Sequence, residues 1–240
     1  MPSAAERLIV AFDEPELSKA LALGRQLRGL ARYAKIGSIV FTAAGPEAIE
    51  QFKALGFEIF LDLKFHDIPS TVEKSCRAAA RHGVSLLTVH ATGRREMLEA
   101  AMRGAQQAER RPKVFAVTEL TSVPVPPTTG GGGSESPGGQ RQMRKDVLAL
   151  VEEAVQAKCD GIVASAQEVK EIRAVFHKAK FEIACPGIRP SWAFRDDQRR
   201  IATPAAALAA GADLLVIGRP ITEAPDPRAA AEQILKEMEV

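Results

Sequence analysis

The chain has 240 residues, 46% of them hydrophobic, which is enough to bury one sizeable core. Its 32 basic and 30 acidic residues leave a net charge of +2 with no long basic run, so we expect no nucleic-acid or membrane partner. Apolar stretches stay below the roughly 18 residues that span a bilayer, no signal-peptide pattern opens the chain, and three widely spaced cysteines, Cys76, Cys159 and Cys185, indicate a reduced, cytoplasmic protein.

Eight short apolar runs alternate with longer amphipathic stretches. We expect buried strands at 8–12, 33–37, 59–65, 86–91, 114–120, 161–165, 182–188 and 214–219. Helices are expected at about 15–30, 46–55, 71–82, 94–108, 143–158, 167–178, 204–210 and 227–238. Strict alternation predicts a parallel α/β sheet, and eight units within residues 1–240 match a single-domain (β/α)8 TIM barrel. A doubly wound open sheet is the alternative, but no strand is followed by G-x-G-x-x-G.

The segment at about 122–140, "SVPVPPTTGGGGSESPGGQ", interrupts this alternation between the fifth strand and the next helix. It is rich in Pro, Gly and Ser and has no apolar face. Loops of this length are usually functional lids or disordered insertions, and the "GGGGS" at its centre also resembles an engineered linker.

Two helix starts carry an S-x-x-E capping box. Ser165 with Glu168 predicts one of them, and Ser70 with Glu73 predicts a second helix that begins near Thr71.

Charged residues stand at the end of the third predicted strand, "IFLDLKF". Side chains two residues apart point the same way along a strand, so Asp62 and Lys64 share the barrel interior, with Cα atoms roughly 6.6 Å apart. Leu61, Leu63 and Phe65 then face the helices. Because a lone buried charge is costly, the pair must satisfy itself or a ligand. A buried ion pair that only braces the barrel is the simplest interpretation of these two residues.

Other charges are expected at the same end of the barrel. Asp13 ends the first strand, Lys35 lies on the second, and Asp67 follows the third on the turn before the next helix. The carboxyl ends of barrel strands carry the catalytic groups in enzymes of this fold. The convergence of these charges therefore predicts an active site.

Two glycine–arginine turns follow the last two strands. Gly187 with Arg189 follows the seventh strand, and Gly218 with Arg219 follows the eighth. Glycine lets backbone N–H groups approach a ligand closely, arginine matches phosphate geometry, and a phosphate site after strands seven and eight recurs in this fold. Two helix-capping turns with surface arginines are the alternative.

These motifs together resemble the orotidine 5′-phosphate decarboxylase family. "FLDLKFHDIPST" fits the family pattern D-x-K-x-x-D-I-P-x-T, and "VTELTS", "SAQE", "PGIRP", "DQRR" and "VIGRPIT" resemble its bacterial branch in the same order. The resemblance extends over nearly the whole chain. It implies conversion of orotidine 5′-phosphate to UMP and CO2 without a cofactor or metal, in a cytoplasmic homodimer with shared active sites.

The resemblance also implies roles for single residues. Lys35, Asp62, Lys64 and Asp67 would form an alternating charge network in which Lys64 stabilises and protonates a C6 carbanion. Asp67, Ile68 and Thr71 would reach into the partner's site. The remaining substrate contacts would be Asp13 and Lys35 to the ribose, Thr121 and Ser122 to the pyrimidine, and Gln198, Gly218 and Arg219 to the phosphate, with Arg189 on the same loop as Gln198.

Two departures and two alternatives accompany this resemblance. The loop after Ser122 is Gly-rich where the family has a more structured cover, and Trp192 with Phe194 makes the "RPSWAFRDDQRR" loop unusually aromatic. A related sugar-phosphate decarboxylase shares D-x-K-x-x-D, but it requires further acidic magnesium ligands, which Glu14 and Glu119 do not match in position. A catalytically silent phosphate-binding barrel would lack one of the network's lysines or acids, and this sequence has them all.

Overall fold

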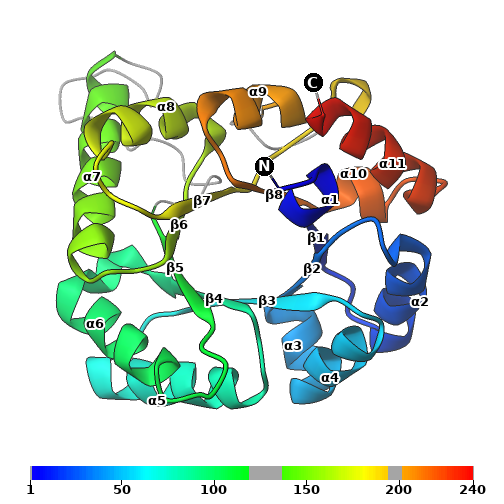
Figure 1. Cartoon of the computed structure of the whole chain (residues 1–240), viewed down its shortest axis with the longest axis horizontal. Helices are drawn as coiled ribbons and strands as arrows, with labels where there is room; N and C mark the ends of the chain where they lie inside the picture. The colour runs from blue at the N-terminus through cyan, green and yellow to red at the C-terminus, as the bar shows by residue number, and fades with distance from the viewer. Residues whose placement is uncertain (1, 119–136, 194–201, 240) are drawn as a thin grey trace.

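Eight parallel strands form a closed barrel surrounded by helices in the computed structural model, which describes residues 2–118, 137–193 and 202–239 (Figure 1). The strands are β1 (Leu8–Phe12), β2 (Tyr33–Gly37), β3 (Glu58–Phe65), β4 (Leu86–His90), β5 (Lys113–Val117), β6 (Gly161–Val163), β7 (Glu182–Cys185) and β8 (Leu214–Ile217). Each strand pairs with the next, and β8 closes onto β1 with Val216 opposite Ile9. The predicted (β/α)8 TIM barrel is confirmed, and the open-sheet alternative is wrong.

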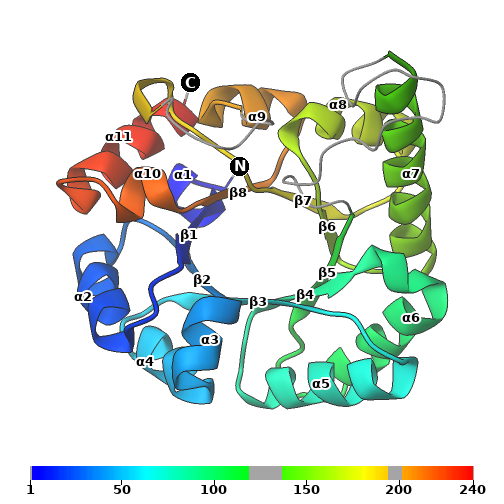
Figure 2. The same cartoon turned by 180° about the vertical axis from the view of Figure 1, so that it is seen from behind.

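The helices lie outside the strands all around the barrel, as the view from behind also shows (Figure 2). They are α1 (Ala4–Arg7), α2 (Leu17–Leu27), α3 (Ser38–Ala44), α4 (Pro46–Ala54), α5 (Pro69–Arg81), α6 (Arg94–Ala105), α7 (Pro137–Gln156), α8 (Ala166–Val175), α9 (Pro204–Ala210), α10 (Arg219–Thr222) and α11 (Pro227–Met238), with 3₁₀ turns at η1 (Ala91–Gly93) and η2 (Ser191–Ala193). The short helices α1, α3 and α10 were not predicted. The others match predicted helices.

The apolar core has two parts because successive strand residues face opposite sides of the sheet. The larger part lies between strands and helices and includes Phe12, Ile36 and Leu61. The smaller part fills the barrel, where the Phe60 and Phe115 ring centroids lie 5.9 Å apart. The barrel interior is therefore packed with side chains below the carboxyl ends of the strands, as is usual for this fold.

Strands β5 to β8 end two or three residues earlier than predicted. After β6, Ser165 caps α8 with the predicted capping box to Glu168. After β7, Pro186 has no N–H to donate to a neighbouring strand. After β8, Gly218 is already the N-cap of α10, so Arg219 opens a helix rather than ending a strand. The residues that follow each strand are thus released into loops at one end of the barrel.

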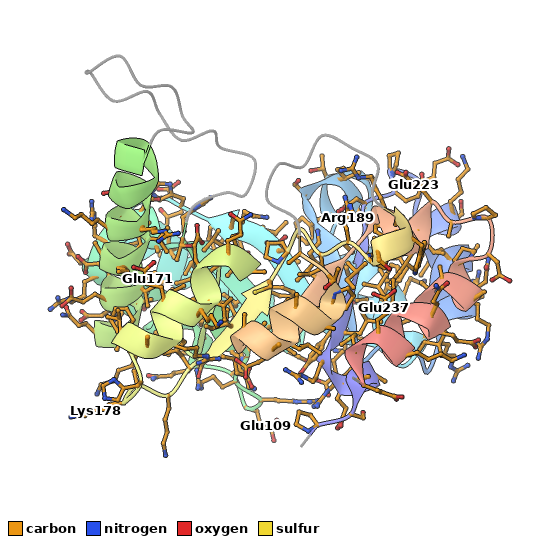
Figure 3. All side chains as sticks on the ribbon, turned by 90° about the horizontal axis from the view of Figure 1, so that it is seen from above. Glu109, Glu171, Lys178, Arg189, Glu223 and Glu237 are labelled. Atoms are coloured by element: carbon orange, nitrogen blue, oxygen red, sulfur yellow. The ribbon has the colours of Figure 1, made fainter. Side chains whose placement is uncertain are left out.

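The two ends of the barrel are distinguished in Figure 3, which shows the molecule turned by 90°. Arg189, which follows β7, lies at one end. Glu109 and Lys178, which precede β5 and β7, lie at the opposite end. All strands run in the same direction, so the end with Arg189 also receives the residues that follow β1, β2 and β3.

The start of α5 corrects one prediction. The helix begins at Pro69 with Ile68 as its N-cap and no side-chain cap, so Ser70 is not a capping residue. Proline suits the first helical position because its φ is already helical and its missing N–H is not needed there. Glu73, the expected capping partner of Ser70, instead accepts hydrogen bonds from Arg77 at 3.3 Å and Arg103 at 3.2 Å.

The predicted loop at about 122–140 also ends earlier than expected. Residues 119–136 lie outside the described residues, and α7 begins at Pro137. Residues 137–140 are therefore helical. Two glycines disfavour a helix there on propensity, but they stand in the first turn, directly after a proline at the first position.

The helices carry no membrane-spanning segment among the residues that the structure describes. None of them is both long enough and apolar enough to cross a bilayer.

Candidate active site

Four charged side chains alternate in sign at the carboxyl end of β1, β2 and β3. The Lys35 ammonium lies 3.1 Å from Oδ1 of Asp13 and 3.5 Å from Oδ2 of Asp62. The Lys64 ammonium donates to both oxygens of Asp62, at 2.9 and 2.8 Å. We call these four residues the charge chain. It runs in the order Asp13, Lys35, Asp62, Lys64, and it confirms that the side chains of Asp62 and Lys64 point to the same side.

Asp62 is the most constrained member of the charge chain. Its side chain is only 12% exposed. Burial alone would raise the pKa of the Asp62 carboxyl, but the charges of Lys35 and Lys64 and hydrogen bonds from Lys64 and Thr88 lower it below its ordinary value. The carboxylate therefore stays ionised at neutral pH, and it holds two ammonium groups close together.

The backbone at Lys64 departs from a regular strand. Pairing between β3 and β4 shifts register: Leu61 lies opposite Leu87, but Phe65 already lies opposite Val89. Lys64 itself has a φ of 50°, in the left-handed region that costs a non-glycine residue on the order of 1–3 kcal/mol. The unfavourable conformation thus occurs at the residue whose ammonium binds Asp62.

One glycine leaves room for the charge chain, and a second glycine lies beside it. A Cβ at Gly37 would lie 3.0 Å from the Lys35 ammonium and 3.2 Å from Oδ1 of Asp13. A Cβ at Gly218 would lie 3.4 Å from Cβ of Ala11 and 4.0 Å from Oδ2 of Asp13. The turn after β8, which carries Arg219, therefore lies directly beside the acidic end of the charge chain.

Asp67 lies apart from the charge chain within one subunit. It is exposed, and its Oδ1 accepts a hydrogen bond from the N–H of Ile68 at 2.7 Å. Ile68 is 64% exposed, and Thr71 on α5 is exposed as well. The structure thus brings together three of the four residues predicted for the network, joined by Asp13. It leaves the predicted cross-dimer group on the surface.

The two predicted phosphate arginines differ in their surroundings. Arg219 is half-buried in the first position of α10. Arg189 is buried at 6% exposure, its guanidinium donates to the carbonyl of Ile188, and its N–H donates to Ala202. Arg189 therefore helps to hold the base of its own loop. Thr121, Ser122 and Gln198 lie outside the described residues.

The charge of Lys64 reaches one neighbouring histidine. The pKa of His90 is lowered mainly by burial and further by the nearby charges of His66 and Lys64. Its ring is therefore neutral near pH 7. The ring centroids of His66 and His90 lie 5.5 Å apart. This pair borders the basic end of the charge chain.

A hollow of about 470 Å³ lies at the opposite end of the barrel from the charge chain. Many of its charged groups are paired, including Arg32 with Glu58 at 3.0 Å and Lys113 with Glu182 at 2.7 Å. Catalytic groups of this fold gather at the carboxyl ends of the strands. The charge chain is therefore the candidate active site, in preference to this hollow.

Comparison with protein families identifies the chain. The model of the "Orotidine 5′-phosphate decarboxylase / HUMPS family" matches residues 6–234. The chain belongs to this family.

Individual relatives of this family member are similar over almost their full length. Orotidine 5′-phosphate decarboxylase of Halorhodospira halophila is 47% identical over 97% of this chain and 95% of its own. That of Saccharophagus degradans is 43% identical over 97% and 94%. The crystal structure of orotidine 5′-phosphate decarboxylase from Lactobacillus acidophilus matches with a TM-score of 0.80 at 35% identity, covering 98% of this chain and 100% of that one.

Sequence reasoning missed Thr88 and Gly37 at the site of this family member. Thr88 is fully buried, and its hydroxyl donates to Oδ1 of Asp62 at 3.0 Å. The pattern offered a clue in each case. Thr88 is a polar residue inside an otherwise apolar run, and Gly37 ends the predicted strand that carries Lys35. Neither clue indicates a role without the neighbouring strands in place.

We predict that Asp62→Asn reduces the acid sensitivity of folding. The pKa of Asp62 is below its ordinary 3.8 in the folded protein, so just below pH 4 the unfolded chain binds this proton more readily than the folded one. The free energy of unfolding should fall as pH drops through this window, less steeply in Asp62→Asn than in the parent. Urea unfolding at several pH values measures both slopes.

The control for this prediction is Glu232→Gln. Glu232 is a surface residue whose carboxylate pairs with Arg228 at 3.0 Å, and its loss should change the slope little. Equal slopes in the parent and Asp62→Asn would contradict the prediction.

Proposed function

We propose that this protein decarboxylates orotidine 5′-phosphate to UMP and CO2, a step of de novo pyrimidine biosynthesis. One observation carries the proposal: the Asp13–Lys35–Asp62–Lys64 charge chain, located at the catalytic end of the barrel in a member of this family. The relatives named orotidine 5′-phosphate decarboxylase support the choice of substrate.

The reaction needs a fixed cation next to one carbon of the pyrimidine. Breaking the bond between C6 and its carboxylate leaves an electron pair on C6, in the plane of the ring, where no ring carbonyl can accept it directly. The Lys64 ammonium stabilises this charge and then gives its proton to C6. The products are UMP and CO2, and Lys64 regains a proton from water. The protein's own groups complete this sequence, and the proposal includes no cofactor or metal.

Asp62 contributes by aiming Lys64. Its two oxygens hold the ammonium at 2.8 and 2.9 Å, and Lys35 approaches the same carboxylate from the other side. Asp62 would lie near the departing carboxylate, where like charges raise the energy of the bound substrate. We assign the main catalytic effect to Lys64, because stabilising a developing charge acts directly on the transition state.

The remaining substrate contacts are divided among the ribose, the pyrimidine and the phosphate of the nucleotide. Asp13 and Lys35 contact the ribose, and Thr121 and Ser122 contact the pyrimidine. Arg219, Gln198 and the backbone at Gly218 bind the phosphate, with Arg189 at the base of the same loop. The closeness of Gly218 to Asp13 supports this order, because it puts the phosphate turn beside the ribose end of the charge chain.

We further propose a homodimer with shared active sites. Asp67, Ile68 and Thr71 are exposed in one subunit, and Ile68 presents a large apolar side chain at 64% exposure. A second copy of the chain that covers this segment would bury Ile68 and bring Asp67 to the other subunit's Lys64.

The three cysteines are buried, and burial raises the pKa of each thiol to about 12, as suits a cytoplasmic protein with reduced thiols.

The test of the activity is a loss of ultraviolet absorbance when purified protein is mixed with orotidine 5′-phosphate, with UMP identified as the product. The same assay in EDTA separates this function from a sugar-phosphate decarboxylase, which depends on magnesium. Turnover that survives EDTA supports the proposal. Absence of UMP under all conditions would refute it.

We predict that Lys64→Ala nearly abolishes turnover and leaves the fold intact, because the ammonium is both the stabilising charge and the proton donor. The kcat of the variant and its circular dichroism spectrum measure the two effects. Lys170→Ala, which removes an exposed lysine on α8, is the matched control and should keep full activity. A loss of only tenfold in Lys64→Ala, equivalent to about 1.4 kcal/mol, is too small for this role.

We predict that two inactive variants complement each other. In a mixture of Lys64→Ala and Asp67→Ala subunits, each heterodimer has one site with both changes and one site with neither. Activity should therefore reappear after subunit exchange, toward half the parent value within heterodimers. Exchange verified by mass spectrometry without any recovery of activity would contradict shared sites.

We predict that Arg219→Ala lowers kcat/KM for orotidine 5′-phosphate by roughly 10²–10⁴, or about 3–5 kcal/mol, because its guanidinium forms two charge-assisted bonds to the phosphate. Turnover of the phosphate-free nucleoside should scarcely change. Arg228→Ala, which removes a surface arginine on α11, is the control. Equal losses on both substrates would mean that Arg219 supports the barrel and does not bind phosphate.

A further inference from the structure

Thr88 connects the charge chain to the backbone that presents Lys64. It lies in the middle of β4 and is fully buried. Leu86 belongs to the core inside the barrel, whereas Leu87 and Val89 belong to the core outside it. Two residues along a strand share a face, so Thr88 points into the barrel beside Asp62 and Lys64.

The Thr88 hydroxyl has two partners on β3. It accepts a hydrogen bond from the backbone N–H of Lys64 at 2.9 Å and donates one to Oδ1 of Asp62 at 3.0 Å. A hydroxyl has one hydrogen to donate, and an ionised carboxylate can only accept. The directions of both bonds are therefore fixed. The hydroxyl accepts from the Lys64 N–H and donates to the Asp62 carboxylate.

The irregular pairing of β3 explains why a side chain is needed here. Between the pairs Leu61–Leu87 and Phe65–Val89, β3 has three residues where β4 has only Thr88. The bulge takes the N–H of Lys64 out of the regular ladder, and an unpaired buried N–H is unfavourable. The hydroxyl of Thr88 supplies the missing acceptor. Lys64, whose N–H makes this contact, is the residue with the unusual φ of 50°.

We propose that Thr88 is a positioning residue, whose hydroxyl ties the Asp62 carboxylate to the Lys64 backbone and so aims the Lys64 ammonium. This inference rests on the proposed function of Lys64. Asp62 holds the ammonium end of the Lys64 side chain, and Thr88 holds its backbone end. Without the hydroxyl, the Lys64 N–H and the Asp62 carboxylate each lose a partner, and the ammonium that Asp62 holds has more orientations available to it.

The electrostatics of Asp62 agree with this arrangement. Among the residues that the structure describes, the ionisable groups near this carboxylate are Lys35 from β2, Lys64 from its own strand and His90 from β4, with Asp13 linked through Lys35. The hydrogen bond from Thr88 adds to the effect of the two lysines in lowering the pKa of Asp62. Removal of the hydroxyl should therefore raise the pKa of Asp62, although both lysines keep their charge.

Four side chains at position 88 separate the hydroxyl from packing. Threonine and valine have nearly the same shape but differ by the hydroxyl, and serine and alanine form a second such pair. We expect Thr88→Val and Thr88→Ala to lower kcat for orotidine 5′-phosphate by about 10–100-fold, as loss of a positioning contact should, with KM changed less than about threefold. Thr88→Ser should retain kcat within about threefold of the parent.

Thr118→Val is the matched control. Thr118 is also a buried threonine, but its hydroxyl donates to the carbonyl of Val163 at 3.0 Å and contacts no member of the charge chain. This variant should lose stability and keep its kcat. If kcat falls equally in Thr118→Val and Thr88→Val, or Thr88→Ser is as slow as Thr88→Ala, then the effect belongs to packing and the proposal is overturned.

A second readout does not require the proposed activity. Carboxyl carbon NMR follows the titration of Asp62 in the parent, in Thr88→Val and in Thr118→Val. A higher midpoint in Thr88→Val alone supports the tie between Thr88 and Asp62, even if the parent fails to decarboxylate orotidine 5′-phosphate and the proposed function falls. An unchanged midpoint in Thr88→Val overturns the tie, whatever the parent's activity.

Discussion

The site depends on the burial of one carboxylate. Asp62 lies inside the barrel at 12% side-chain exposure, where an unpaired carboxylate would be very costly. Lys35 from β2, Lys64 from β3 and Thr88 from β4 together offset this cost. Because these partners come from three adjacent strands, the strand register itself sets the distances between the charges. The geometry of the charge chain therefore depends on how these three strands pair.

The most irregular part of the described barrel is the part of β3 that carries Asp62 and Lys64. Strand β3 runs regularly against β2 from Glu58 to Asp62, and its pairing with β4 shifts only after Leu61. The regular part of β3 holds Asp62 opposite Gly37 of β2. The irregular part changes the direction in which the Lys64 side chain points. Bulges often serve this purpose beside active sites, since an extra residue changes the direction of a side chain without moving the sheet. The unfavourable φ of Lys64 is the local cost of that direction.

The sequence predicted the features that follow from the alternation of side chains along a strand and from the parallel direction of the strands. Alternation along a strand places Asp62 beside Lys64, and parallel strands bring Asp13 and Lys35 to the same end. The capping box at Ser165 was also correct, because both of its bonds are local. The same motif at Ser70 failed, since Pro69 starts α5 earlier. Thr88 could not be predicted, because threonine is an ordinary strand residue and its role depends on a bulge in the neighbouring strand, which no pattern within β4 encodes.

The charge chain also supports the proposed homodimer. Its two carboxylates and two ammonium groups sum to zero, so an anionic substrate meets no net repulsion from them. The acidic end is satisfied by Lys35, but at the other end Lys64 is one-third exposed and pairs with a carboxylate that Lys35 shares. A further carboxylate at Lys64 would continue the alternation and hold the ammonium from a second side. Asp67 is an exposed carboxylate three residues along the chain, on a turn that leads away into α5. The local backbone separates these two residues, whereas a symmetric pairing of two chains can bring one to the other.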